Sequence, residues 1–159
     1  MHGVSTEAHC NDFVPYVLDD FLTHNRIDAI VLGGRWLAGE TARLEATIRM
    51  LQARGIDVTI IGPGVEYEGE FPRMLAMGLL RGDLSALDHA RVKDRKPLND
   101  EIAAMVARTG ARFLSPYDIE CPEGRCRMTD PEGGPFHYDY GHITLSGTRL
   151  IIERLAEPR

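Results

Sequence analysis

The chain has 159 residues, which fits one domain and is too short for two of ordinary size. Hydrophobic residues make up 43% and charged residues 26%, a balance typical of a globular fold and not of a disordered chain. Acidic residues outnumber basic ones 24 to 18, and the net charge of -6 argues against nucleic acid or anionic lipid as a partner.

Helices and strands are predicted to alternate along the chain. An opening helix is expected over residues 12–24, and Pro15 should delay its regular part. Three apolar runs predict buried parallel strands, because continuous apolar character is typical of strands that helices cover on both faces. These runs are Asp28–Gly33, Asp57–Gly62 and Ala111–Leu114.

A helix is expected between the first two strands. Leu44, Ile48 and Leu51 form one apolar stripe, and Gly55 would end this helix in a left-handed conformation. A second stripe, over residues 98–106, predicts the helix that precedes the third strand.

The stretch 63–96 is rich in proline and glycine and predicts a long connection with one helix near Arg73–Leu80. Its charge run Arg91–Lys96 indicates an exposed segment. A last helix is expected around Leu150–Leu155.

This order implies right-handed crossovers and a three-layer α/β/α sandwich with a parallel sheet. The first β-α-β unit of such a fold is absent from the predicted elements, since the chain opens on a helix. In open α/β sheets, ligands bind outside the carboxyl ends of the strands. Candidate site residues are therefore sought at 33–36, at 62–64 and between 114 and 142.

Asp139 and His142 give the strongest indication of catalysis. A carboxylate three residues before a histidine can accept a hydrogen bond from one ring nitrogen and leave the other free as a base. Thr144 suits the N-cap of the last helix and would hold His142 at a rigid boundary. The same short pattern also fits a surface turn with an incidental histidine.

Gly34, Arg35 and Trp36 follow the first strand. Backbone amides and a fixed guanidinium at this position could stabilise a developing oxyanion or bind substrate. A tight turn with Trp36 packed over the end of the sheet explains the same residues without any chemistry.

Cys121 and Cys126 enclose a short loop that contains proline and glycine. The pair could form a disulfide, remain as reduced thiols, or supply two zinc ligands with His137 as a third and no clear fourth. Cys10 is left over, which in an exported protein suggests a lost partner.

Several of these motifs occur together in the order of a known family. They resemble the SGNH domain fused to membrane acyltransferases of the acyltransferase-3 family, which O-acetylate bacterial surface polysaccharides. The matching stretches are Ile30–Trp36 ending in Arg-Trp, Val58–Pro63 ending in Ile-Gly-Pro, the paired cysteines, and residues 136–147 around Asp139-x-x-His142. Thr144 stands where the family usually has serine, and Ile143 where it has leucine.

The resemblance implies a flavodoxin-like SGNH fold and a Ser-His-Asp mechanism. Serine would attack an acyl donor, His142 would take its proton and return it to the leaving group, and Asp139 would orient the imidazole. A glycan of lipopolysaccharide or another surface polysaccharide would be the acceptor, and a membrane acyltransferase domain, on the same or a separate chain, the partner. No bound cofactor or metal is implied.

The family's nucleophile has no counterpart in the chain. Gly3-Val4-Ser5 offers only Gly-x-Ser, with no strand before it, so Ser5 is interpreted as a loop residue. We therefore expect residues 1–159 to form a single SGNH-like domain whose N-terminal unit lies upstream. The chain alone should be inactive or nearly so, because His142 has no alcohol to activate.

Other functions stay open. The chain could be a free-standing SGNH esterase that removes acetyl groups, a non-catalytic binding module with the same cleft, or a degraded reading frame. The family resemblance implies the periplasmic side of the inner membrane. The chain itself shows no apolar run of the ~18 residues of a membrane span and no secretion signal at its start.

Overall fold

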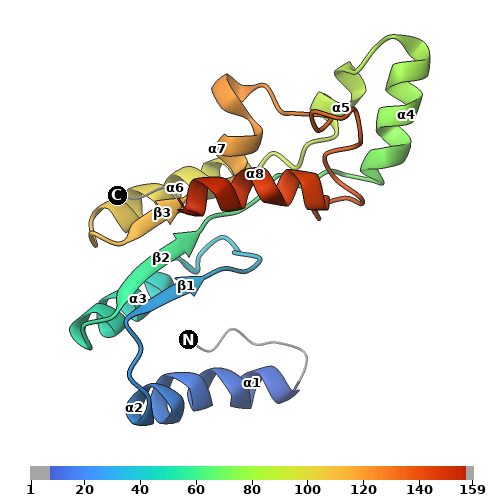
Figure 1. The fold of residues 1–159 in the computed structure, drawn as a ribbon. Coiled ribbons are helices and arrows are strands. Elements are labelled where there is room, and N and C mark those ends of the chain that lie inside the picture. The colour runs from blue at the N-terminus through green and yellow to red at the C-terminus, as the bar shows by residue number, and fades with distance from the viewer. Residues whose placement is uncertain (1–7, 157–159) are drawn as a thin grey trace.

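The computed structural model describes the backbone of residues 8–156 and the side chains of residues 12–153. In that range β1 (Ala29–Leu32), β2 (Asp57–Ile61) and β3 (Arg112–Leu114) form one parallel sheet in the order β1-β2-β3 (Figure 1). All three strands lie where the apolar runs predict them. The sheet therefore aligns the carboxyl ends of its strands along one side.

The helices between and after the strands are α3 (Thr41–Ala53), α4 (Phe71–Arg81), α5 (Ser85–His89), α6 (Arg95–Ala107), α7 (Pro116–Glu120), the 3-10 turn η2 (Pro122–Gly124) and α8 (Leu145–Ala156). The two apolar stripes correctly predict α3 and α6, and the helices expected near residues 73–80 and 150–155 are present as α4 and α8. The short helices α5, α7 and η2 were not predicted, because so few residues carry too little periodic pattern. Gly55 has a φ of 77° just after α3, as expected for a left-handed cap.

The N-terminal segment is one continuous helical run with a change of type. It consists of α1 (Ala8–Pro15), the π-helix η1 (Tyr16–Phe21) and α2 (Leu22–His24). Pro15 has no backbone N–H, so the regular hydrogen-bond ladder is interrupted at it and π turns follow. Leu18 and Leu22 pack this run against the main core.

The main core lies between the sheet and the two helices α3 and α6. Val58 and Ile60 of β2 point into it, and both side chains are almost fully buried. The other buried members are Leu44, Ile48, Leu51, Ile56, Leu98, Ile102, Met105 and Val106. Burial of this cluster fixes the sheet against one helical layer and is the main source of stability for the fold.

The opposite face of the sheet is covered unevenly. Figure 1 shows α8 lying beside β3, at the far side of the sheet from β1. On β1, by contrast, the side chain of Val31 is 53% exposed. The prediction that helices cover both faces of this strand is therefore wrong for the described residues. The outer edge of β1 is also unpaired, because β2 is its single neighbour in the described sheet.

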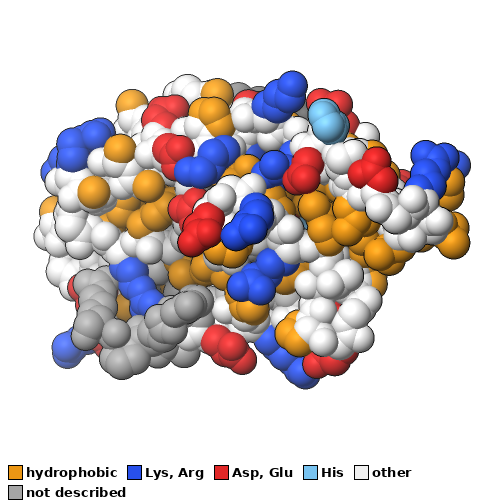
Figure 2. Space-filling view, turned by 90° about the horizontal axis from the view of Figure 1, so that it is seen from above, with side chains coloured by type: hydrophobic (Ala, Val, Ile, Leu, Met, Phe, Trp, Pro, Cys, Tyr) orange, Lys and Arg blue, Asp and Glu red, His pale blue; other side chains and the backbone are white. Residues whose placement is uncertain are grey.

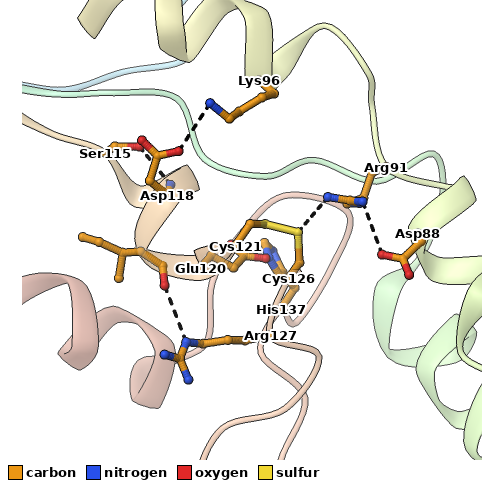
Figure 3. Close-up of a disulfide and its surroundings, with 11 residues drawn as sticks. Asp88, Arg91, Lys96, Ser115, Asp118, Glu120, Cys121, Cys126, Arg127 and His137 are labelled. Carbon is orange, nitrogen blue, oxygen red and sulfur yellow. Dashed lines mark hydrogen bonds and ion pairs between the residues drawn. A yellow bond between two sulfur atoms is a disulfide. The ribbon is translucent and has the colours of Figure 1, made fainter. Parts of the chain in front are cut away.

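A second cluster lies beyond the sheet and supports the α4–α5 hairpin. Its buried members are Val65, Tyr67, Phe71, Leu75, Leu87, Tyr117 and Cys121. Cys121 and Cys126 form a disulfide at its border, and Arg91 Nη1 donates to the sulfur of Cys126 over 3.0 Å (Figure 3).

Surface charge is mixed in sign. Figure 2 shows basic and acidic side chains interspersed on one face, with apolar patches between them and no continuous basic area. Within residues 8–156, no helix combines the length and apolar character that crossing a membrane requires.

Candidate active site

Asp139 and His142 lie at the tip of a small hairpin, which we call the tip turn (residues 138–142). An antiparallel bridge joins His137 to Ile143, and Tyr138 N–H donates to the carbonyl of His142 over 3.0 Å. At the tip, Asp139 Oδ1 accepts hydrogen bonds from the backbone N–H groups of Gly141 (2.9 Å) and His142 (2.7 Å). Aspartate favours turns of this kind because its short side chain reaches its own backbone.

The second carboxylate oxygen of Asp139 binds the imidazole. His142 Nδ1 donates to Asp139 Oδ2 over 2.7 Å, so the contact predicted from the three-residue spacing is present. The backbone N–H of Gly141, with further hydrogen bonds from His142, lowers the pKa of Asp139 to about 2. An ionised Asp139 keeps the imidazole proton on Nδ1, which leaves Nε2 free to accept one.

Two tyrosine rings support the same imidazole. The Tyr138 ring stacks on His142 with centroids 5.5 Å apart and planes 16° apart. The Tyr140 ring meets it edge-on at 5.9 Å. The side chain of His142 is nevertheless 60% exposed, so the ring is held in place and remains open to a ligand.

A cleft of about 260 Å³ lies beside His142. Gly34 and Arg35 line it after β1, Gly64 after β2, and His142 after the long segment that follows β3. The carboxyl ends of β1 and β2 therefore lie at the cleft, as the rule for open α/β sheets predicts. A larger hollow of about 750 Å³ runs along β3, but its lining includes neither Asp139 nor His142.

An ion-pair network that was not predicted forms one wall of the cleft. Arg35 donates from Nε and Nη2 to the two carboxylate oxygens of Glu66, over 3.1 and 2.9 Å. Arg95 Nη2 lies 3.3 Å from Glu66 Oε1. The hydrogen bond from Arg35 lowers the pKa of Glu66, against the opposite effect of burial. Glu66 is therefore ionised and fixes the exposed guanidinium of Arg35 at the cleft.

Arg95 corrects the interpretation of the charge run Arg91–Lys96 as an exposed segment. Its side chain is only 5% exposed, and its Nη1 donates to the carbonyl of Trp36 over 3.1 Å. Burial is possible because Glu66, in the loop between β2 and α4, supplies a counter-charge at the start of α6. Nothing in the local sequence around Arg95 indicates that partner.

Trp36 is turned away from the cleft. Its indole N–H donates to the carbonyl of Ile61 over 2.7 Å, and its ring packs against the main core. Of the three candidate residues after β1, the structure brings Gly34 and Arg35 to His142, whereas Trp36 closes the end of the sheet.

The cysteines belong to the second cluster, and His137 packs against two of its rings, Tyr67 and Phe71. His137 Nε2 and Glu120 Oε1 are 2.7 Å apart, and both side chains are fully buried (Figure 3). Burial raises the pKa of Glu120, although the hydrogen bond to His137 opposes this. In the described part of the chain, no three His, Cys, Asp or Glu side chains gather to hold a metal ion. Ser5 and the side chain of Cys10 lie outside the described residues.

Comparisons with known proteins found a matching protein family and a similar solved structure. A family model described as the SGNH domain fused to AT3 domains matches residues 1–157. None of the curated proteins compared with the chain matches it. Among solved structures, the periplasmic domain of the lipopolysaccharide acetyltransferase of Salmonella ser. Paratyphi A superposes with a TM-score of 0.63 at 16% identity. The match covers 80% of this chain and 55% of that one, so the chain spans about half of that domain's length.

Proposed function

This chain belongs to the family of SGNH domains fused to AT3 domains, and we propose that it supplies the catalytic base of an O-acyltransferase acting on bacterial surface glycans. The observation that carries the proposal is the hydrogen bond of 2.7 Å between His142 Nδ1 and Asp139 Oδ2 beside the cleft. This pair provides an oriented imidazole whose second nitrogen is free, which is what acyl transfer from a serine requires.

The proposed reaction has two halves that use the same proton acceptor. In the first, Nε2 of His142 takes the proton of a serine hydroxyl as its oxygen bonds to the acyl carbon, and then returns it to the departing donor group. In the second, Nε2 takes the proton of a glycan hydroxyl, whose oxygen attacks the acyl-serine, and then returns it to the serine. Asp139 stabilises the imidazolium that forms in each half.

Arg35 is proposed to stabilise the negative charge that develops on the acyl oxygen. Glu66 fixes its guanidinium through two hydrogen bonds, so little reorganisation is needed when charge develops. Because two of its five N–H donors bind Glu66, the others remain for the reacting group.

The serine is proposed to come from a further strand that pairs with β1. The edge of β1 is unpaired in the described sheet, and Val31 is exposed on this strand. A parallel strand at this edge would end beside Gly34 and Arg35, at the mouth of the cleft. Without it the chain should have at most a trace of activity.

The acyl donor is proposed to arrive through the membrane domain to which members of this family are fused, on the periplasmic side of the membrane. The disulfide between Cys121 and Cys126 supports an oxidising compartment of this kind.

The test is glycan O-acetylation by the full-length protein that contains this domain, measured by mass spectrometry of the glycan. Substitution H142A should lower transfer by at least ~10³-fold. Variant H24A is the matched control, because His24 is an exposed histidine 3.5 Å from Asp20 on the N-terminal helical run. Equal transfer by wild type and H142A would refute the proposal. Release of free acetate without transfer would favour the esterase instead.

A further inference from the structure

Tyr138 and Tyr140 are exposed beside the proposed base. Their side chains are 59% and 44% exposed, although both rings contact His142. The other aromatic rings near this hairpin behave differently, since Tyr67, Phe71 and Phe136 are all at most 2% exposed.

Aromatic rings exposed in this way are more typical of ligand recognition than of packing in a hydrophobic core. A tyrosine ring offers a rigid apolar face and a polar hydroxyl at low cost in conformational entropy, which is why such rings are enriched where ligands bind. A single exposed apolar side chain needs no explanation, but two on one turn that both touch a reactive histidine do.

We propose that Tyr138 and Tyr140 form an acceptor subsite that takes one saccharide ring. This inference rests on the proposed function and specifies where the sugar ring of the acceptor would bind. The C–H face of a sugar ring is apolar and would pack on the tyrosine rings, while its hydroxyls hydrogen-bond at the rim. One of these hydroxyls then lies at Nε2 of His142, where it can lose its proton.

The size and polarity of the cleft support a single sugar ring. Its volume of about 260 Å³ is below the ~300–1,000 Å³ of pockets that enclose drug-sized ligands. Tyr140, Arg35 and His142 line it together, so aromatic, cationic and basic groups all face the same space. Tyr138 does not line the cleft, and its exposed ring would extend the subsite next to His142. The free N–H donors of Arg35 suit hydroxyl oxygens, whereas a long acyl chain would need an enclosed apolar wall.

The test uses saturation-transfer NMR of this chain with methyl glycosides of glucose, galactose, mannose and rhamnose. At least one glycoside should receive saturation through its ring C–H groups. Variants Y138A and Y140A should each weaken its binding by roughly 3- to 10-fold, whereas Y138F and Y140F keep the ring and most of the binding. Variant Y16A is the matched control, because Tyr16 is 51% exposed on η1.

Two results would overturn the subsite. One is the absence of saturation transfer to all four glycosides. The other is equal binding by wild type and by the double variant Y138A/Y140A. The imidazole signals of His142 report whether each variant keeps its tip turn, so a lost fold is not mistaken for a lost subsite.

Failure of the subsite and failure of the proposed function are distinguishable in the full-length protein. If H142A abolishes transfer and Y138A/Y140A transfers with unchanged kcat and KM, the base stands and the subsite is wrong. If H142A transfers acetyl groups at the wild-type rate, His142 is not the base, regardless of the results for the tyrosine variants.

Discussion

His137 and His142 flank one hairpin tip and have opposite surroundings. His137 is fully buried and paired with Glu120, whereas the side chain of His142 is 60% exposed and paired with Asp139. Each imidazole nitrogen that meets a carboxylate does so at 2.7 Å. The two contacts look alike, but one is sealed inside the protein and the other opens on the cleft.

From this contrast we expect His137 to contribute to the stability of the fold and His142 to contribute to catalysis. Variant H137A should lower the free energy of unfolding by about 3–5 kcal/mol, because it leaves a cavity among aromatic rings and a buried Glu120 without its partner. Variant H142A should change it by no more than about 0.5 kcal/mol. Urea unfolding of both variants measures the difference, and similar losses would contradict the assignment.

Glu66 lines the cleft, and we predict that it also contributes to the stability of the fold. Variant E66Q removes the counter-charge of Arg95, whose side chain is 5% exposed, and should cost about 3 kcal/mol of unfolding free energy. Variant E45Q is the control, because Glu45 pairs with Arg49 and Arg108 near solvent, where ion pairs contribute little, and it should lose much less stability than E66Q. A smaller loss for E66Q than for E45Q would contradict the burial of Arg95.

Asp139 should make the tip turn resistant to acid. Its pKa of about 2 lies below the ~3.9 of an unfolded aspartate. A lowered folded pKa contributes stability above the unfolded value, and this contribution is lost as the pH falls from about 4 through 2. Carbon-13 NMR of the Asp139 carboxyl group should show its titration near pH 2. Titration near the unfolded value would mean that the backbone N–H groups do not bind it.

The sequence predicts those parts of the molecule that depend on neighbouring residues. The strands β1 and β2 follow from their apolar runs, and the pairing of Asp139 with His142 follows from a three-residue spacing within one turn. Gly34 and Arg35 were expected near this cleft because parallel strands present their carboxyl ends on one side of a sheet, and both line it together with His142.

The parts that could not be predicted depend on residues that are distant in the chain. Glu66 meets Arg95 from the loop between β2 and α4, and Glu120 of α7 meets His137 17 residues later, so no local pattern marks either pair. The exposure of Val31 is another example, because its apolar run is typical of a strand covered on both faces.

The assignment of His142 as the base is tested most directly by the protonation of its two ring nitrogens, measured by long-range proton–nitrogen NMR at mildly alkaline pH. We expect a proton on Nδ1 and none on Nε2 in the wild type, because Asp139 accepts the Nδ1 hydrogen at 2.7 Å. In D139N this preference should be lost. A wild-type ring with its proton on Nε2 would contradict the central claim, since that nitrogen could not then act as a base.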